Sequence, residues 1–155
     1  PQGSLAMPAF QPTNPRFAER VRDSFGRQGV MALLGAELAR VEPGECEIRL
    51  PYRPELSQQH GYFHGGIIGT IADSAGGYAA FTLMPADASV LTVEYKVNLL
   101  APGAGELLIA RGRVVKPGRT LIVAAVDAMA VKAGRETLCA TLLQTLMTMH
   151  WRSDQ

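Results

Sequence analysis

One carboxylate in the sequence has no charge partner along its own segment. Asp73 is the only charged residue between Gly65 and Phe81, a stretch whose spacing predicts a helix. Aspartate is unfavourable inside a helix, so its presence there needs a reason. A solvent-exposed or salt-bridged aspartate is one interpretation. The other is a carboxylate held in a cleft, where it acts as a general base or as a nucleophile.

The start of the same segment carries groups suited to binding a developing negative charge. His64, Gly65 and Gly66 open the predicted helix. The first N–H groups of a helix have no intrahelical partners and lie at the positive end of its dipole. Glycine there lets a carbonyl oxygen approach closely, which would form an oxyanion site from backbone alone.

Glycines inside the segment also need an explanation. Gly69, Gly76 and Gly77 are interior positions, and each glycine costs roughly 1 kcal/mol relative to alanine in a helix. They follow the face of Asp73 at steps of three and four. A face of small residues lets another backbone or a flat ligand come close, which favours a subunit interface or a ligand cleft. The alternative is that these glycines are merely tolerated.

The elements that must position these groups follow from the periodicity. An apolar stripe at helical spacing supports the helix 65–81 and consists of Ile68, Ile71, Ala72, Ala75 and Ala79. A short amphipathic helix is expected from Pro15, after an Asn14 cap. Two-residue alternation predicts strands at 37–41, 46–50, 91–99, 107–115, 121–131 and 137–149. Short turns between successive strands imply antiparallel pairing, so one long helix on a strongly curved antiparallel sheet is expected, an α+β architecture.

Length and charge restrict the class of protein. The chain has 155 residues and a formal net charge of +1, with its basic residues scattered. We therefore expect one domain over residues 15–152, a flexible tail at 1–14, and no nucleic-acid partner. No apolar run is long enough to span a membrane, and the tail lacks the charged-then-apolar order of a signal peptide. A cytoplasmic protein with no membrane partner is expected.

Two cysteines, Cys46 and Cys139, lie in apolar, strand-like runs. Two buried, reduced thiols are the preferred interpretation. Neither a C-x-x-C nor an H-E-x-x-H spacing occurs, so no metal site is expected. No cofactor is expected either.

The run from His64 to Ala75, HGGIIGTIADSA, resembles the signature HGG-x6-D of the PaaI-like hotdog acyl-CoA thioesterases. The preceding run from Gln58 to Phe63 is similar to that family's approach to the motif. The resemblance extends over about residues 35–150 and includes the order of the elements. It implies the hotdog fold, a long central helix wrapped by a curved antiparallel β-sheet. It also implies paired protomers with active sites between them.

The resemblance implies roles for individual residues. Asp73 would act on the thioester as general base or nucleophile. The backbone N–H of Gly66 would polarise the thioester carbonyl, with His64 supporting the loop. Thr92 would help to place the water. Gln58 stands where many members have asparagine, and it would donate to the thioester or the water.

Other residues are candidates for binding the substrate. Gly65 belongs to the close-approach loop, and His60 either contacts the substrate or makes structural hydrogen bonds. Lys116 and Arg119 flank a turn where relatives often place cations near the CoA phosphates.

Two further groups of side chains are candidates for contact with the same substrate. Arg111 and Arg113 alternate on a nearby strand and offer guanidinium forks to phosphate. Tyr78, Phe81 and Met84 either line an acyl tunnel or belong to the core.

These features predict an acyl-CoA thioesterase that hydrolyses a small or medium acyl- or aryl-CoA to the free acid and CoA. Self-association as a homodimer or a dimer of dimers, a homotetramer, is expected. The alternative is a non-catalytic acyl-CoA-binding protein of the same fold. A hotdog dehydratase would need a paired histidine and aspartate at a different spacing.

Overall fold

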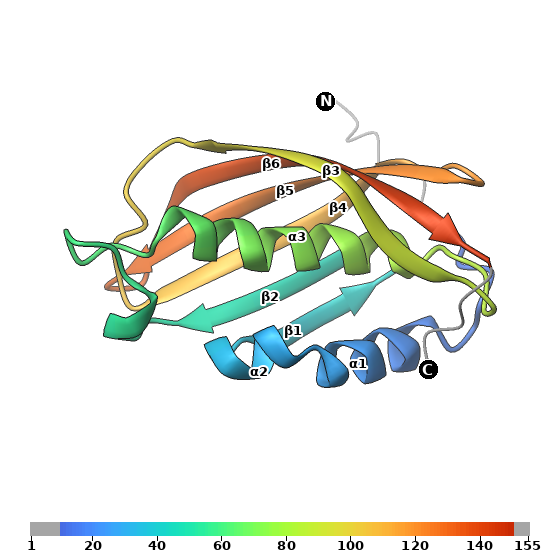
Figure 1. Ribbon diagram of the computed structural model, residues 1–155, viewed down its shortest axis with the longest axis horizontal. Helices are drawn as coiled ribbons and strands as arrows, with labels where there is room; N and C mark the ends of the chain where they lie inside the picture. The colour runs from blue at the N-terminus through green and yellow to red at the C-terminus, as the bar shows by residue number, and fades with distance from the viewer. Residues whose placement is uncertain (1–9, 151–155) are drawn as a thin grey trace, which may run out of the picture.

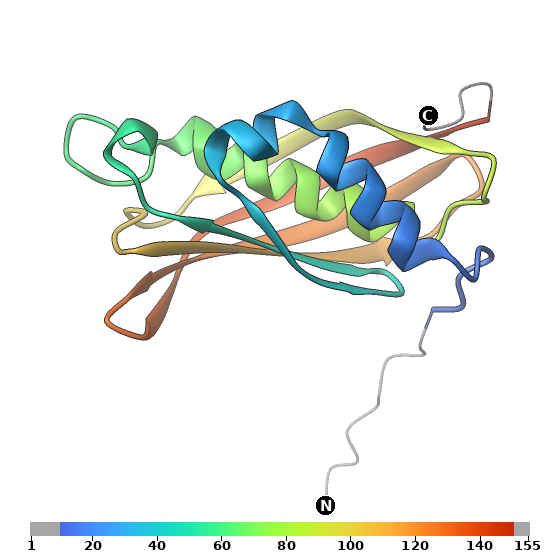
Figure 2. The same cartoon turned by 90° about the horizontal axis from the view of Figure 1, so that it is seen from below.

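The computed structural model describes residues 10–150, in which an antiparallel sheet curves around one long helix, α3 (Gly65–Phe81) (Figure 1; Figure 2). The sheet has six strands in the order β1-β2-β4-β5-β6-β3. The strands are β1 Glu37–Glu42, β2 Glu45–Pro51, β3 Ser89–Leu99, β4 Leu107–Lys116, β5 Leu121–Lys132 and β6 Arg135–Met149. The shorter helices are α1 Phe17–Arg27, α2 Gly29–Leu34 and the 3₁₀ turn η1 Pro54–Leu56. The predicted α+β architecture and the predicted bounds of the long helix are confirmed.

The apolar stripe of α3 is buried against the sheet, as predicted. Its members Ile68, Ile71, Ala72, Ala75 and Ala79 are each at most 2% exposed. Burying one isoleucine side chain stabilises the fold by about 1.5–3 kcal/mol. The approach is close: a Cβ on Gly112 of β4 would lie 2.5 Å from the carbonyl oxygen of Ala75. The backbone of α3 therefore rests directly on β4.

The prediction of a subunit interface or ligand cleft at the glycines of α3 has different outcomes at two positions, because Gly76 faces the sheet whereas Gly77 lines a cavity. A Cβ on Gly76 would lie 1.8 Å from Oε1 of Gln144 and 2.9 Å from Cγ2 of Val126. One on Gly77 would lie 3.5 Å from Leu146. The missing side chain of Gly76 makes room for side chains of β5 and β6, so this glycine serves the packing of helix on sheet, whereas a Cβ on Gly77 would make only an ordinary contact.

β3 forms one edge of the sheet, and no other described strand covers that edge. It pairs with β6 and not with β4, the next strand in the chain. The expectation that successive strands pair is wrong here, because both sides of β4 are occupied by β2 and β5. Four apolar side chains of β3 are about half exposed: Leu91, Val93, Tyr95 and Leu99. Such an edge is a surface on which another strand can pair.

α1 begins two residues after Pro15, the predicted start. The Asn14 side chain accepts a hydrogen bond from the Arg16 backbone N–H at 3.0 Å, so it caps the turn before the helix. Arg20 of α1 donates to the carbonyl oxygen of Phe81 at 3.0 Å. Because a cation is favourable at a helix C-terminus, this contact fastens α1 to the last turn of α3.

The boundaries predicted for the tail (1–14) and for the single domain (15–152) stay predictions. Residues 1–9 and 151–155 lie outside the described part of the chain. Within the predicted tail, Phe10 is partly buried and packs against the core.

Both cysteines are free and buried, as predicted. Burial raises the pKa of Cys46 to about 12. Burial also raises the pKa of Cys139. Because the thiolate is the reactive form, neither thiol is expected to react readily in the folded protein.

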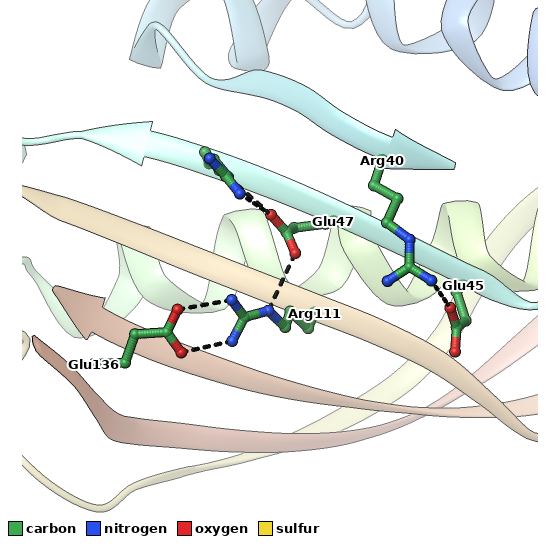
Figure 3. Close-up of polar contacts among 6 residues, drawn as sticks. Arg40, Glu45, Glu47, Arg111 and Glu136 are labelled. Atoms are coloured by element: carbon green, nitrogen blue, oxygen red, sulfur yellow. Dashed lines mark hydrogen bonds and ion pairs between the residues drawn. The ribbon is translucent and has the colours of Figure 1, made fainter. Parts of the chain in front are cut away.

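The outer face of the sheet, turned away from α3, carries a network of ion pairs (Figure 3). The Arg111 guanidinium donates to both carboxylate oxygens of Glu136 at 2.8 Å, and its Nε donates to Glu47 at 3.1 Å. Arg49 donates to the other Glu47 oxygen at 2.8 Å. Burial acts to raise the pKa of Glu47, but the hydrogen bonds from Arg49 and Arg111 outweigh it and leave that pKa lowered.

We expect Glu47→Gln to lower the free energy of unfolding by about 1 kcal/mol at neutral pH, because a mostly buried acceptor loses its charge. The lowered pKa means that Glu47 stabilises the fold fully above the ordinary glutamate pKa of about 4.3. That stabilisation is lost as the pH falls through the folded-state value. Urea unfolding at neutral and at acidic pH checks this.

Wild type and Glu47→Gln should become equally stable in acid, where both carry a neutral side chain. Glu45→Gln is the matched control, since it breaks an exposed pair with Arg40 and should change stability by less than about 0.5 kcal/mol. A deficit of Glu47→Gln that persists undiminished in acid would contradict the charge-based account.

Candidate active site

Asp73 lies in the middle of α3 with its carboxylate held between β3 and β6. Its Oδ1 accepts a hydrogen bond from Thr92 Oγ1 at 2.7 Å and a second from Gln144 Nε2 at 2.9 Å. Within residues 10–150, no basic side chain pairs with Asp73 and no hydrogen bond reaches Oδ2. The interpretation of Asp73 as a salt-bridged aspartate is therefore wrong for the described chain, and one carboxylate oxygen is left for chemistry.

A cavity of about 470 Å³ opens beside this carboxylate. Its walls come from α3, from the start of β3 and from the junction between α1 and α2. They are formed by Ser24, Arg27, Gln28, Asp73, Ser74, Gly77, Tyr78, Val90, Leu91 and Thr92. Seven of these ten residues carry polar side chains, and polar and apolar surface contribute about equally to the walls.

A chain of hydrogen bonds joins the N-terminal helices to α3 beside Asp73. Gln28 Oε1 accepts from the Ser74 hydroxyl at 2.9 Å. Gln28 Nε2 donates to the Tyr78 hydroxyl at 3.1 Å, and Ser24 Oγ lies 3.2 Å from the same hydroxyl. These contacts fix one wall of the cavity.

Tyr78 lines the cavity, whereas Phe81 and Met84 do not. Phe81 is 0% and Met84 is 1% exposed, and both belong to the core. Tyr78 reaches the polar wall with its hydroxyl, and its predicted role in an acyl tunnel stays a prediction.

The start of α3 differs in one respect from the prediction. His64 caps the helix, and its Nδ1 accepts a hydrogen bond from the Gly66 N–H at 2.9 Å. The N–H that was expected to polarise a thioester carbonyl is thus engaged by the imidazole. The N–H of Gly65, the first residue of α3, has no hydrogen-bond partner within the described range 10–150. Gly65 is therefore the open donor.

Gln58 lies at this same end of α3 and away from Asp73. It borders a second cavity of about 460 Å³ together with Gly65 and Leu99. Its Oε1 accepts hydrogen bonds from the backbone N–H groups of His60 and Tyr62, which shape the loop. The His60 side chain is exposed, and neither cavity is lined by it.

One chain does not bring the predicted groups into a single site. Gly65 borders the second cavity and Asp73 borders the first. Eight positions separate them, which is about 12 Å along a helix axis. An oxyanion donor and an attacking group must both lie about 3 Å from the same reacting centre. The structure thus joins Asp73 to Thr92 but leaves Gln58, His64 and the glycine amides at the start of α3, beside another cavity.

The cations predicted to hold CoA phosphates fall into two sets. Arg111 and Arg113 are engaged on the outer sheet face, where Arg113 pairs with Asp127 at 3.3 Å. They are therefore not the predicted phosphate forks. Lys116 and Arg119 are exposed and lie in or beside the β4–β5 hairpin. The Thr120 carbonyl oxygen of this hairpin accepts a hydrogen bond from the Thr148 N–H of β6, and Thr148 pairs with Val90 of β3. The hairpin therefore lies at the end of the sheet that holds Asp73.

Sequence reasoning missed Ser24, Gln28 and Ser74 as cavity residues and missed Gln144 altogether. For Gln28 no sequence signal exists, since its approach to α3 depends on how α1 packs. Gln144 did leave a signal, because it interrupts an inward-facing apolar series that includes Leu142 and Leu146.

Comparisons with known proteins agree with this geometry. The Thioesterase superfamily model matches residues 60–139, a range that includes the start of α3, Asp73 and Thr92. A solved structure of a thioesterase family protein from Silicibacter pomeroyi has a TM-score of 0.85 and 53% identity, covering 86% of this chain and 98% of its own. The E. coli PaaI protein shares the fold with a TM-score of 0.77 at 18% identity, over 86% of this chain and 94% of its own.

Two sequence relatives extend the comparison. A predicted esterase from Halobacterium salinarum is 36% identical over 64% of this chain and 68% of its own length. A 1,4-dihydroxy-2-naphthoyl-CoA hydrolase from Listeria monocytogenes is 27% identical over 59% of this chain and 75% of its own length.

The curved sheet around a single helix is the hotdog fold, and the predicted PaaI-like resemblance is confirmed. With a carboxylate on that helix and a glycine-rich helix start, fold and site define a thioester hydrolase. The chain belongs to the Thioesterase superfamily. Among the described residues, no helix is both long and apolar enough to cross a membrane.

Proposed function

We propose that this protein is an acyl-CoA thioesterase in which Asp73 acts on the thioester as general base or nucleophile. One observation carries the proposal. The Asp73 carboxylate borders a cavity of about 470 Å³, has one oxygen held by two donors and pairs with no cation within residues 10–150.

The chemistry needs few groups. Hydrolysis of a thioester requires an attacking water or carboxylate, stabilisation of negative charge on the carbonyl oxygen, and positioning. Thiolate is a good leaving group, so no strong general acid is required. The Gly65 N–H at the positive end of α3 supplies the oxyanion donor, and loss of one such donor typically costs about 2.7–4 kcal/mol.

A second copy of the chain would complete the site. Gly65 lies beside Leu99 of β3, since a Cβ on Gly65 would be 2.7 Å from Leu99. Asp73 lies beside Thr92 of β3, from which it accepts a hydrogen bond. Two β3 edges paired antiparallel about a twofold axis between positions 95 and 96 place Thr92 opposite Leu99 of the partner subunit, because both are equally far from the axis. Gly65 of the partner subunit would then face Asp73.

The polar cavity bears on the substrate class. Ser24, Gln28, Ser74 and Tyr78 form a hydrogen-bonding wall within reach of a short acyl group. We propose a small aryl-CoA or acyl-CoA that carries a hydroxyl or similar group. The Listeria monocytogenes relative, whose name specifies a dihydroxylated aryl-CoA, is consistent with that chemistry.

Asp73→Asn should lower kcat by about 10²–10⁴-fold, because the amide cannot accept a proton or attack. Thiol release from acyl-CoA, followed with a disulfide reagent, measures this, and the two buried cysteines add little background. Circular dichroism and thermal unfolding should show an unchanged fold. Equal, slow thiol release by wild type and variant across a panel of acyl-CoAs would instead leave a non-catalytic acyl-CoA-binding protein.

A hydroxylated aryl-CoA should give a kcat/KM about fivefold above the same aryl-CoA without the hydroxyl, as one hydrogen bond of about 1 kcal/mol predicts. Gln28→Leu should remove this preference, because it opens the polar wall. Arg22→Ala, on α1 but outside the cavity lining, is the control. A preference that survives Gln28→Leu would refute the role of the wall.

Two inactive single variants should recover activity when they are co-expressed and form mixed dimers. Gly65→Pro deletes the donor N–H at a helix position that suits proline, and Asp73→Asn removes the carboxylate. Mixed dimers contain one intact site of two and half of the dimers are mixed, so co-expression should recover about a quarter of wild-type activity.

Co-expression of the single variants Asp73→Asn and Thr92→Val is the matched control. Asp73 and Thr92 belong to the same side of the shared site, so no intact site can form in a mixed dimer. Failure of the first pair to recover activity, with dimers present by analytical ultracentrifugation, would show that the site is not shared between subunits.

A further inference from the structure

A buried glutamine on the inner face of the sheet contacts Asp73. Gln144 of β6 is 1% exposed, and it is flanked on the inner face by Leu142 and Leu146, which are 2% and 0% exposed. Its Nε2 donates to Asp73 Oδ1 at 2.9 Å and to the Asp73 carbonyl oxygen at 3.3 Å. It lines neither of the cavities that border Asp73 and Gly65.

The arrangement is unfavourable for stability in two ways. Gln144 Oε1 is buried without a hydrogen-bond partner within the described residues, which costs free energy in folding. The space for this amide exists only because residue 76 is glycine, since a Cβ there would lie 1.8 Å from Oε1. Glycine in a helix interior is itself destabilising. An aliphatic side chain at 144 with alanine at 76 would avoid both costs.

The orientation of the amide follows from charge. Turning it over would place Oε1 against the Asp73 carboxylate, where two acceptors repel. Nε2 must therefore face Asp73. Thr92 donates to the same oxygen at 2.7 Å. Two donors from different strands thus fix Oδ1, and the carboxylate presents Oδ2 in one orientation.

We propose that Gln144 is a positioning residue for Asp73 and that Gly76 is the space it needs. The inference rests on the proposed role of Asp73 in thioester hydrolysis. Gln144 does not touch the substrate; it holds the acting carboxylate at the angle from which its free oxygen reaches the thioester or the water. Small errors in such an angle cost large factors in rate.

Gln144→Met keeps the length of the side chain and removes both polar atoms. It should lower kcat by about tenfold to a hundredfold and leave KM within about twofold, because ground-state binding does not involve Gln144. Its thermal stability should equal or exceed that of wild type, since the unpartnered oxygen is gone. Leu146→Met, on the same inner face of β6, is the control and should keep kcat within about twofold.

A double-mutant cycle separates positioning from packing. Gly76→Ala should lower kcat by displacing the amide, and Gln144→Ala by removing it. Because both delete the same hydrogen bond, the double variant should be no slower than the slower single variant.

Losses that multiply would overturn the proposal, as would Gln144→Met and Gln144→Leu with kcat within about threefold of wild type. If Asp73→Asn stays active, the role of Asp73 fails; if it is inactive while Gln144→Met stays fast, only the role of Gln144 fails.

Discussion

The close approach of α3 to the sheet is the constraint on which the rest of the structure depends. Gly112 of β4 admits the backbone of α3 at Ala75, and Gly76 of α3 admits a side chain of β6. With a Cβ on Gly112 the helix would have to lift away from the strands, and with a Cβ on Gly76 the Gln144 amide would have to move. The position of Asp73 relative to Thr92 and Gln144 would then change. Packing density here sets the geometry of the carboxylate, because close-packed interiors transmit small displacements.

A single rigid helix carries the Gly65 N–H and the Asp73 carboxylate, the two groups that the proposed mechanism needs, so the proposed site requires a second chain. The donors at Gly65 and the carboxylate at Asp73 are separated by a fixed rise of about 12 Å. No rotation of side chains can close that distance. The exposed apolar edge of β3 lies beside both half-sites. Its burial by a second copy would stabilise the assembly and complete the site in the same step.

Polar groups are divided between the two faces of the sheet. On the outer face, Glu47, Arg111 and Glu136 satisfy one another and leave little capacity for a ligand. On the inner face, the buried amide of Gln144 donates a hydrogen bond to Asp73. The ionic groups of the outer face are paired, whereas the Asp73 carboxylate has one oxygen with no hydrogen bond within residues 10–150. This division explains why arginines that looked suitable for phosphate in the sequence have a structural role.

The sequence by itself determined the α+β fold, the bounds of the long helix, the buried cysteines and the isolation of Asp73, because hydrophobic period and helix capping are local properties. It did not show that Gly76 serves the packing of helix on sheet, since a glycine that faces a strand looks the same in the sequence as one that faces a cleft. It could not pair β3 with β6, which depends on which strand edges are already occupied. Only the tertiary structure showed that Gly65 has the open N–H, that Gln28 walls the cavity and that Gln144 holds Asp73. These contacts join residues up to 71 positions apart, and such distances in space are set by packing and not by any local pattern.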